Sequence, residues 1–381
     1  MKTVAIDIRL IGRNRTGDEA VFRNLVRGIL ETDRRNRYVL LTDTGDSDDL
    51  SRIREAITKG GTLPENAEIV SLPARNRFSW NAWSVPRFLL RREMDVFHTQ
   101  YILPWFVPRR TKIVTHIHDV SFRAYPEYIG FSDRLFLSLL IPRTMRRSDR
   151  IVTPSRFTKD EIISRYGVSS DRIAVIPNAV DPSFLVEPNE NDVSRAVSRN
   201  GLPDSYVLSV GTMQPRKNIP LLVRAFARVR KDVPELKLVL VGGRGGRQYD
   251  TAIDTALSEE GLEDAVIFPG YVPQEDMPSV YKAARVFVFP SLYEGFGIPI
   301  LEAFAMGTPV ATSDIAPFCE VGENGITVFD PKDVAKCAEA LYTLSTDENA
   351  RLRHIRAGKD RLQRYSWNDS VRVLVVLYES V

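Results

Sequence analysis

The chain has 381 residues, 43% of them hydrophobic and 27% charged, which is typical of a folded soluble protein. This length is too great for a single core, so two domains are expected. The two cysteines, Cys319 and Cys337, exclude a disulfide framework and a cysteine-based metal site. The net charge is +3, and arginine runs in the first 150 residues suit phosphates, an anionic membrane or an ordinary solvated surface.

The N-terminal apolar run carries Asp7 and Arg9, which the core of a secretory signal peptide would not tolerate. No stretch reaches the roughly 18 to 20 apolar residues needed to cross a bilayer. We expect a cytoplasmic protein, with contact at the inner face of the plasma membrane as an open alternative.

Short β-branched runs alternate with amphipathic segments along the first half of the chain. Val21, Leu25 and Ile29 share one face of a helix predicted over residues 19–31. This alternation predicts a parallel sheet with crossover helices. The predicted strands of this half are 3–8, 37–42, 67–72, 95–99, 112–117 and 150–155.

The alternation restarts after residues 176–184, a stretch with prolines that suits an interdomain linker. We therefore predict two doubly wound α/β domains, residues 1–180 and 181–365, that face each other across a cleft. A helix is predicted over 366–381, and it can pack on either domain, including as the completion of the first. The predicted strands of the second half are 206–211, 236–243, 265–270, 286–291 and 308–313.

A strand, a glycine-rich turn and a helix follow one another over residues 286–307. Pro299 lies near the first turn of this helix, and Gly307 ends it. Backbone amides of the glycine-rich turn then lie at the positive end of the helix, which attracts a phosphate or a hydroxyl-rich ligand. These amides belong to Gly295, Phe296 and Gly297.

Two glutamates, Glu294 and Glu302, lie eight positions apart in this apolar stretch. Helical side chains lean toward the N-terminus, so the Glu302 carboxylate can point at the same turn as Glu294. Each carboxylate can accept two hydroxyl hydrogen bonds, as a ribose diol and a hexose require. The alternative is a helix-terminal charge and a solvent-facing helix position, although the apolar flanks indicate a helix that is mostly buried.

The segment EGFGIPILE, which begins at Glu294 and ends at Glu302, resembles the donor-site motif of the retaining glycosyltransferases of family 4. The similarity continues in order through DIRL, HTQYILP, HIHDVSF, RIVTPSRFTKDEI, VIPNAV and GTMQPRKNIPLLVRAF. This resemblance implies the GT-B fold of two Rossmann-like domains, with the nucleotide sugar held mainly by the C-terminal one. It also implies that Glu302 binds the ribose and that Glu294, with the turn amides, orients the sugar.

A pair of cations follows the strand predicted over 206–211, where a helix capped by Asn218 begins. Arg216 and Lys217 can both face a diphosphate, which gains negative charge as the glycosidic bond breaks. In the family, the lysine that matches Lys217 contacts the pyrophosphate together with a nearby arginine. That arginine lies closer to the preceding glycine in some members, where this chain has Thr212. An accidental surface pair is the alternative.

Two of the four histidines, His116 and His118, lie on one side of the strand predicted over 112–117, with His118 beside Asp119. Such a pair can simply pack and hydrogen-bond, and no third metal ligand is identifiable. The resemblance places His118 at the donor sugar and the reaction centre.

The first strand-to-helix turn, within residues 11–25, departs from the family. Most relatives have a glycine-rich turn there, whose amides approach the donor phosphates. This chain has Gly17 followed by Asp18 and Glu19, which suit a helix N-terminus but would repel a phosphate. Gly17 remains a candidate for contact with the donor or the acceptor.

Two further signals concern the base and a metal. In relatives the nucleobase lies beside the loop that matches Tyr271 and Val272, and readout by the backbone leaves the base unnamed. The run DSDDL over residues 46–50 imitates the metal motif of another glycosyltransferase fold, but a helix cap accounts for it better. No G-x-G-x-x-G run occupies the first turn, which argues against a nicotinamide cofactor. We expect neither metal nor cofactor, and no nucleic-acid partner.

The segment 75–93 interleaves Trp80, Trp83, Phe88 and Leu89 with arginines. An interfacial amphipathic segment near a lipid-linked acceptor has this composition. A buried helix with a basic outer face has it too, and both interpretations remain open.

The runs HTQYILP, VTHIHDVSF and GTPVATS are most similar to bacterial mannosyltransferases of polysaccharide assembly. The resemblance therefore implies transfer of mannose from GDP-mannose, by front-face substitution with retention, to a saccharide or lipid-linked saccharide acceptor. The alternatives are a UDP-hexose-dependent enzyme of the same fold, a storage-glucan phosphorylase or synthase, and a non-catalytic regulator that binds nucleotide sugars.

Overall fold

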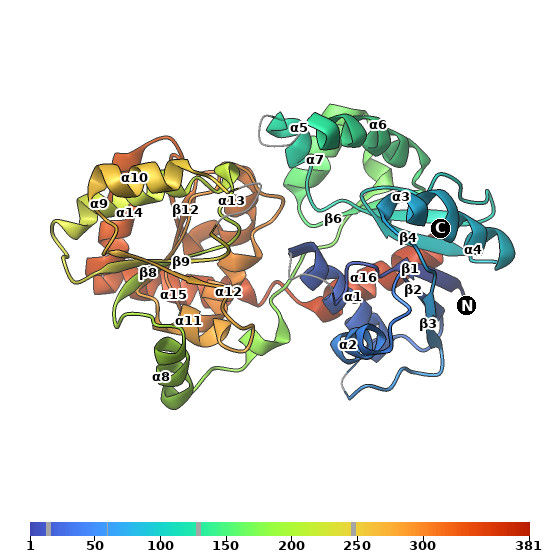
Figure 1. Ribbon diagram of the computed structural model, residues 1–381, viewed down its shortest axis with the longest axis horizontal. Coiled ribbons are helices and arrows are strands. Elements are labelled where there is room, and N and C mark those ends of the chain that lie inside the picture. The colour runs from blue at the N-terminus through green and yellow to red at the C-terminus, as the bar shows by residue number, and fades with distance from the viewer. Residues whose placement is uncertain (13–16, 59, 127–130, 245–248) are drawn as a thin grey trace. The chain divides into compact units, whose positions relative to one another are not determined.

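The computed structural model describes residues 1–12, 17–58, 60–126, 131–244 and 249–381. The chain forms two compact α/β units (Figure 1). The first comprises Met1–Ala124, Ile129–Asn178 and Ser366–Val381, and the second comprises Tyr125–Tyr128 and Ala179–Tyr365.

The first unit contains a seven-stranded sheet with the order β3-β2-β1-β4-β5-β6-β7. Every neighbouring pair is parallel, so the strands have their carboxyl ends at one edge. The short edge strand β7 was not predicted. The strands are β1 (Thr3–Asp7), β2 (Arg37–Thr42), β3 (Ala67–Ser71), β4 (Val96–Gln100), β5 (Lys112–His116), β6 (Arg150–Thr153) and β7 (Ile173–Val175).

The second unit contains a six-stranded parallel sheet with the order β10-β9-β8-β11-β12-β13. Here the edge strand β13 was not predicted, and the other five lie within one or two residues of the predicted bounds. The strands are β8 (Tyr206–Val210), β9 (Lys237–Val241), β10 (Val266–Gly270), β11 (Val286–Phe289), β12 (Val310–Ser313) and β13 (Ile326–Phe329).

Helices cover the sheets, as the predicted crossovers require. In the first unit they are α1 (Gly17–Thr32), α2 (Ser47–Ile57), α3 (Arg77–Ser79), the π-helix η1 (Trp80–Ser84), α4 (Val85–Arg91), α5 (Ser121–Ala124), α6 (Phe131–Arg147), α7 (Arg156–Tyr166) and α16 (Trp367–Ser380). In the second they are α8 (Glu190–Arg199), α9 (Ile219–Arg230), α10 (Ala252–Glu260), α11 (Met277–Ala283), α12 (Ile298–Met306), α13 (Ala316–Gly322), α14 (Val334–Thr346) and α15 (Glu348–Leu362). Single 3-10 turns lie at Ser170–Arg172, Pro182–Leu185, Pro215–Lys217 and Glu323–Gly325. In the part of the chain that the structure describes, no helix has the length and apolar character to span a membrane.

The core of the second unit has two layers, one on each face of its sheet (Figure 1). Val207 and Leu238 pack with the helices α9, α10 and α14, whereas Leu208 and Val239 pack with α11 and α12. Successive residues of a strand point to opposite faces of the sheet. Because both faces of this sheet are buried, both sets of side chains are apolar, and the strands appear in the sequence as continuous hydrophobic runs.

The C-terminal helix α16 packs in the first unit, although it follows the second unit in sequence. Gly28 of α1 lies so close to it that a Cβ atom there would come within 2.7 Å of Val371. The Ser370 hydroxyl donates to the Pro177 carbonyl at 2.6 Å, and the Tyr378 hydroxyl lies 2.6 Å from Nδ1 of His98. Of the two placements open from the sequence, the helix therefore takes the one on the N-terminal unit.

Strands β8 and β9 bring two glycines together at their carboxyl ends. Gly242 has a φ of +147°, and a Cβ atom there would lie 2.0 Å from the carbonyl oxygen of Gly211. This position therefore requires glycine both for its backbone conformation and for the close approach. Gly243 next to it has open space around its Cβ position.

We expect Gly242→Ala to lower the free energy of unfolding by at least about 2 kcal/mol, because it adds backbone strain to a steric clash. Gly243→Ala is the matched control and should change it by less than about 1 kcal/mol. Urea unfolding followed by circular dichroism measures both. Equal effects of the two substitutions would contradict this account of the turn.

Candidate active site

Two loops of the second unit meet in a buried ion cluster. Lys217 follows β8, and Glu294 follows the neighbouring strand β11. The Oε1 atom of Glu294 accepts hydrogen bonds from Nζ of Lys217 at 2.5 Å and from Nη1 of Arg216 at 2.8 Å. The three side chains are only 11 to 22% exposed. The structure thus brings together three of the residues that the sequence singled out separately.

The two cations determine the charge of Glu294. Burial works against ionisation, but Arg216 and Lys217 outweigh it and lower the pKa of Glu294 to about 2. Arg216 also joins the backbones of the two loops, since its Nη1 donates to the Tyr293 carbonyl and its own carbonyl accepts from the Leu292 amide at 2.8 Å. The Glu294 carboxylate is therefore ionised at neutral pH, and the cluster is fixed to both loops.

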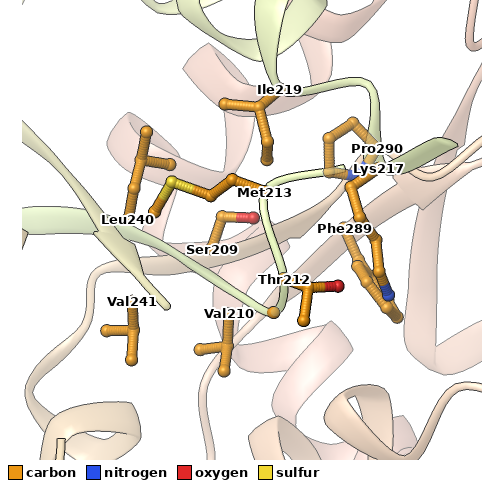
Figure 2. A pocket seen from close by; sticks show the side chains of 11 residues that line it. Ser209, Val210, Thr212, Met213, Lys217, Ile219, Leu240, Val241, Phe289 and Pro290 are labelled. Atoms are coloured by element: carbon orange, nitrogen blue, oxygen red, sulfur yellow. The ribbon is translucent and has the colours of Figure 1, made fainter. Parts of the chain in front are cut away.

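The Lys217 side chain passes over the end of β8 and along an aromatic ring. Figure 2 shows it beside Phe289, with the ammonium 4.7 Å from the ring centroid. A Cβ atom on Gly211 would lie 3.7 Å from this Nζ, an ordinary contact distance, so glycine is favoured there by its φ of +146° and not by the lysine. A small pocket opens here, lined by Gly211, Thr212, Lys217 and Phe289 among others. The ammonium thus lies at a hollow at the carboxyl edge of the sheet, where open α/β sheets bind ligands.

Helix α12 begins at the predicted place, directly after the glycine-rich turn. Gly297 occupies its N-cap position with a φ of +118°, where a side chain would also press on Phe318 and Ile300. Gly295, Phe296 and Gly297 are buried, and they precede the positive end of the helix. Gly307 closes the helix at its other end, as predicted.

Glu302 has a different environment from Glu294. Its Oε2 accepts a hydrogen bond at 2.8 Å from the buried hydroxyl of Tyr281, a partner that the sequence analysis missed. Burial raises the pKa of Glu302 to about 7, the Tyr281 hydrogen bond opposes this rise, and Asp181 adds to it. A buried carboxyl group that titrates near neutral pH is typical of a functional site.

The remaining predicted residues of this unit have simpler surroundings. Tyr271, after β10, is 61% exposed, whereas the side chain of Val272 is buried in the core, so only its backbone can meet a ligand. The prediction that Asn218 caps α9 is wrong in one respect. Asn218 holds the N-cap position with a φ of +56°, but its side-chain amide donates to the Pro331 carbonyl at 2.8 Å instead.

In the first unit, His118 lies just after β5 between two polar groups. Its Nε2 is 3.1 Å from Oε1 of Gln100, and its Nδ1 is 3.8 Å from a carboxylate oxygen of Asp18. His116 stacks on it with 4.4 Å between ring centroids, and His98 stacks in turn on His116 at 6.0 Å. The third histidine was missed, because one histidine in the run DVFHT carries no signal of its own.

The histidine stack is not arranged as a metal site. Burial lowers the pKa of His98 to about 3 and that of His116 well below its usual range, so both rings are neutral. Within the described residues, no group of three or more His, Cys, Asp or Glu side chains could hold a metal ion. The run DSDDL caps a helix, since the Asp46 carboxylate accepts from the amides of Asp48 and Asp49.

The first turn is described up to Gly12 and again from Gly17 onward, because residues 13–16 lie outside the described residues. Gly17 is the first residue of α1, and a Cβ atom there would contact no atom of the residues that the structure describes. The buried Glu19 carboxylate accepts from the Gly12 amide at 2.9 Å. Glu19 thus holds the turn, and Asp18 faces His118.

Comparisons with known proteins identify relatives of the chain. The family model described as Glycosyltransferase Family 4 matches residues 16–184, and the one described as Glycosyl transferases group 1 matches residues 190–361. Over 279 residues the chain is 32% identical to O-antigen chain mannosyltransferase B of Escherichia coli, with 72% of each chain covered. It is 30% identical over 289 residues to O-antigen chain mannosyltransferase RfbU of Salmonella typhimurium, covering 74% of this chain and 75% of that one.

A solved structure shares the fold over its whole length. The HepE protein of Anabaena, in complex with UDP-glucose, superimposes with a TM-score of 0.77 at 18% identity and covers 100% of both chains. At this identity the likeness concerns the fold alone.

The Glu302 pKa predicts a dependence of stability on pH. Because its pKa of about 7 exceeds the ordinary 4.5, the folded protein binds this proton more tightly than the unfolded chain. The stabilisation is complete below pH 4.5 and is lost as the pH rises through 7. We expect the unfolding free energy of the wild type, relative to Glu302→Gln, to fall by roughly 2 to 3 kcal/mol between pH 5 and 8. Urea unfolding across this range should show it, and parallel pH profiles would refute it.

Proposed function

The chain belongs to glycosyltransferase family 4 and has the GT-B fold, and from this premise we propose that it is a retaining mannosyltransferase. In this proposal it moves mannose from GDP-mannose to a saccharide or lipid-linked saccharide during surface polysaccharide assembly. The activity of a glycosyltransferase follows from family membership, whereas the sugar, the nucleotide, the acceptor and the roles of single residues are the proposal.

The observation that carries the proposal is the cluster of Lys217 and Arg216 on Glu294. In the free protein the carboxylate holds both cations in place. A donor diphosphate would add a second anion on the solvent side of Lys217 and Arg216. The cations are then already in position when negative charge develops on the leaving diphosphate, so the site needs little reorganisation. We assign Lys217 and Arg216 to the diphosphate, and Glu294 with the amides of Gly295 to Gly297 to the sugar.

The reaction itself needs few further groups. The bond between the anomeric carbon and the phosphate oxygen breaks, and the nucleoside diphosphate leaves with the electron pair, which Lys217 and Arg216 stabilise. The acceptor hydroxyl attacks on the same face, and its proton passes to the departing phosphate oxygen, so the configuration is retained. The family resemblance gives His118 a role at this centre. In the first unit its ring is held by Gln100 and by the stack on His116.

Glu302 suits the nucleotide ribose. Its carboxylate already accepts one hydrogen bond from Tyr281, and a ribose diol would supply two more donors. Each such bond favours the ionised form, which burial alone disfavours. We assign the nucleobase to the loop after β10, where the Val272 backbone and the exposed Tyr271 are available.

The choice of mannose rests on the two O-antigen mannosyltransferase relatives. A UDP-hexose donor is the second candidate, because the Anabaena protein of the same fold was solved with UDP-glucose. A non-catalytic regulator would bind the donor without transfer.

Binding to a panel of nucleotide sugars, measured by calorimetry, tests the donor site. GDP-mannose should bind more tightly than UDP-glucose. Lys217→Ala should weaken it at least roughly tenfold, because a charged hydrogen bond contributes about 1.5 to 3 kcal/mol. Glu302→Gln should weaken it as well.

Lys336→Ala, which removes an exposed lysine paired with Glu339, is the matched control. The donor site is wrong if no nucleotide sugar binds or if Lys217→Ala binds like the control.

The stereochemical course is a separate test. With GDP-α-mannose and a saccharide acceptor, the product should be an α-mannoside, which the one-bond carbon–proton coupling at the anomeric carbon identifies by NMR. A β-mannoside would exclude front-face substitution. Slow release of free mannose without any transfer would indicate hydrolysis of the donor as a side reaction. The enzyme would then use an acceptor other than the one tested.

A further inference from the structure

Large apolar side chains gather on one surface of the first unit. Phe78, Trp83 and Leu90 lie on the segment from α3 to α4 and are 53, 71 and 57% exposed. Trp105 and Phe106 lie in the loop after β4 and are 54 and 50% exposed. Single exposed apolar residues are common, but a group of four aromatic side chains and a leucine on one surface marks an interaction site.

The segment from Arg77 to Arg91 is a continuous helix with two distinct faces. Trp80, Val85 and Leu89 are fully buried in the core, and the Trp80 indole donates to the Asp7 carboxylate at 2.9 Å. Trp83 and Leu90 point outward instead. The inner face therefore accounts for the packing of the segment, and its outer face, with a tryptophan and a leucine, is left without a structural role.

The helix and the loop after β4 form one surface. The Trp105 amide donates to the Asn81 carbonyl at 2.9 Å, and the rings of Phe78 and Trp105 meet edge to face at 5.0 Å. Arg143 fixes the loop from the other side, since it donates to the Trp105 carbonyl at 2.6 Å and to the Pro104 carbonyl at 3.1 Å. The rings of Phe78 and Trp105 are thus held in place before any partner binds, which lowers the entropy cost of binding.

This surface is cationic throughout. Residues 75–92 and 101–110 contain seven arginines and neither aspartate nor glutamate. Arg87 and Arg91 are exposed, and among the described residues no carboxylate pairs with them. At the edge of the surface, Arg92 pairs with Glu68, and Arg110 pairs with Glu93 at 3.1 Å. A second copy placed face to face would bring arginines against arginines, which opposes a symmetric dimer here.

We propose that this aromatic and arginine surface docks on an anionic phospholipid bilayer. Its defining residues are Phe78, Trp83, Arg87, Leu90, Arg91, Trp105 and Phe106. The rings would enter the headgroup region, where aromatic side chains are favoured, and the arginines would lie among the lipid phosphates. The proposal does not depend on which sugar the protein transfers. Both interpretations that the composition of segment 75–93 left open then apply, each to one face of the helix. One face packs in the core, and the other contacts the membrane.

Sedimentation with phospholipid vesicles tests the proposal. The full chain should bind vesicles that contain phosphatidylglycerol and not vesicles of phosphatidylcholine alone. Binding should weaken as salt is raised, because the Debye length falls from roughly 10 Å at 0.1 M to 3 Å at 1 M. Arg87→Glu with Arg91→Glu should lower the partition coefficient at least roughly tenfold, and Trp83→Ala should lower it severalfold. Trp83→Phe should restore most of the binding that Trp83→Ala loses.

Leu352→Ala with Arg353→Gln is the matched control, because it removes an exposed leucine and an exposed arginine from α15 of the second unit. It should bind vesicles like the wild type, and circular dichroism should show that all variants are folded. The proposal is overturned if the wild type does not bind phosphatidylglycerol vesicles. It is likewise overturned if the variant with Arg87→Glu and Arg91→Glu binds them as tightly as the control does. It is also overturned if analytical ultracentrifugation finds a dimer that Trp83→Ala dissociates.

Discussion

The contact of Glu294 with Lys217 and Arg216 is the interaction on which the second unit's edge depends. The carboxylate and the lysine are 77 positions apart in sequence, and they meet because β8 and β11 are neighbours whose carboxyl ends lie at the same edge. None of the three side chains is well exposed, so removal of one partner would leave an uncompensated charge. The cluster therefore determines the positions of the loop after β8 and the glycine-rich turn together.

Two glutamates at this edge have opposite electrostatic environments. Two cations lower the pKa of Glu294 to about 2, whereas burial beside a tyrosine raises that of Glu302 to about 7. Glu294 is thus charged at all physiological pH values, and Glu302 changes its charge near neutrality. This difference suits the roles that we propose. Glu294 positions the two cations, and Glu302 accepts hydrogen bonds from the hydroxyl groups of a ligand.

Much of the fold could be predicted from the sequence, because buried parallel strands appear as unbroken apolar runs. The edge strands β7 and β13 were missed, since three or four residues with partly exposed positions give no such run. The residues proposed for the site came one by one from the family motif. The ion cluster was not, because the motif does not say that Lys217 and Glu294 touch, and Tyr281 is an unmarked tyrosine in a helix. The segment 75–93 was ambiguous because composition does not say that Trp80 is buried and Trp83 exposed.

In the proposed complex the donor's diphosphate binds the same two cations that Glu294 holds in the free protein. A crystal structure with GDP-mannose or GDP bound tests this most directly. We predict a phosphate oxygen within hydrogen-bond distance of Nζ of Lys217, with the ribose hydroxyls on Glu302. A nucleotide bound elsewhere, with Lys217 still engaged by Glu294 alone, would contradict the account.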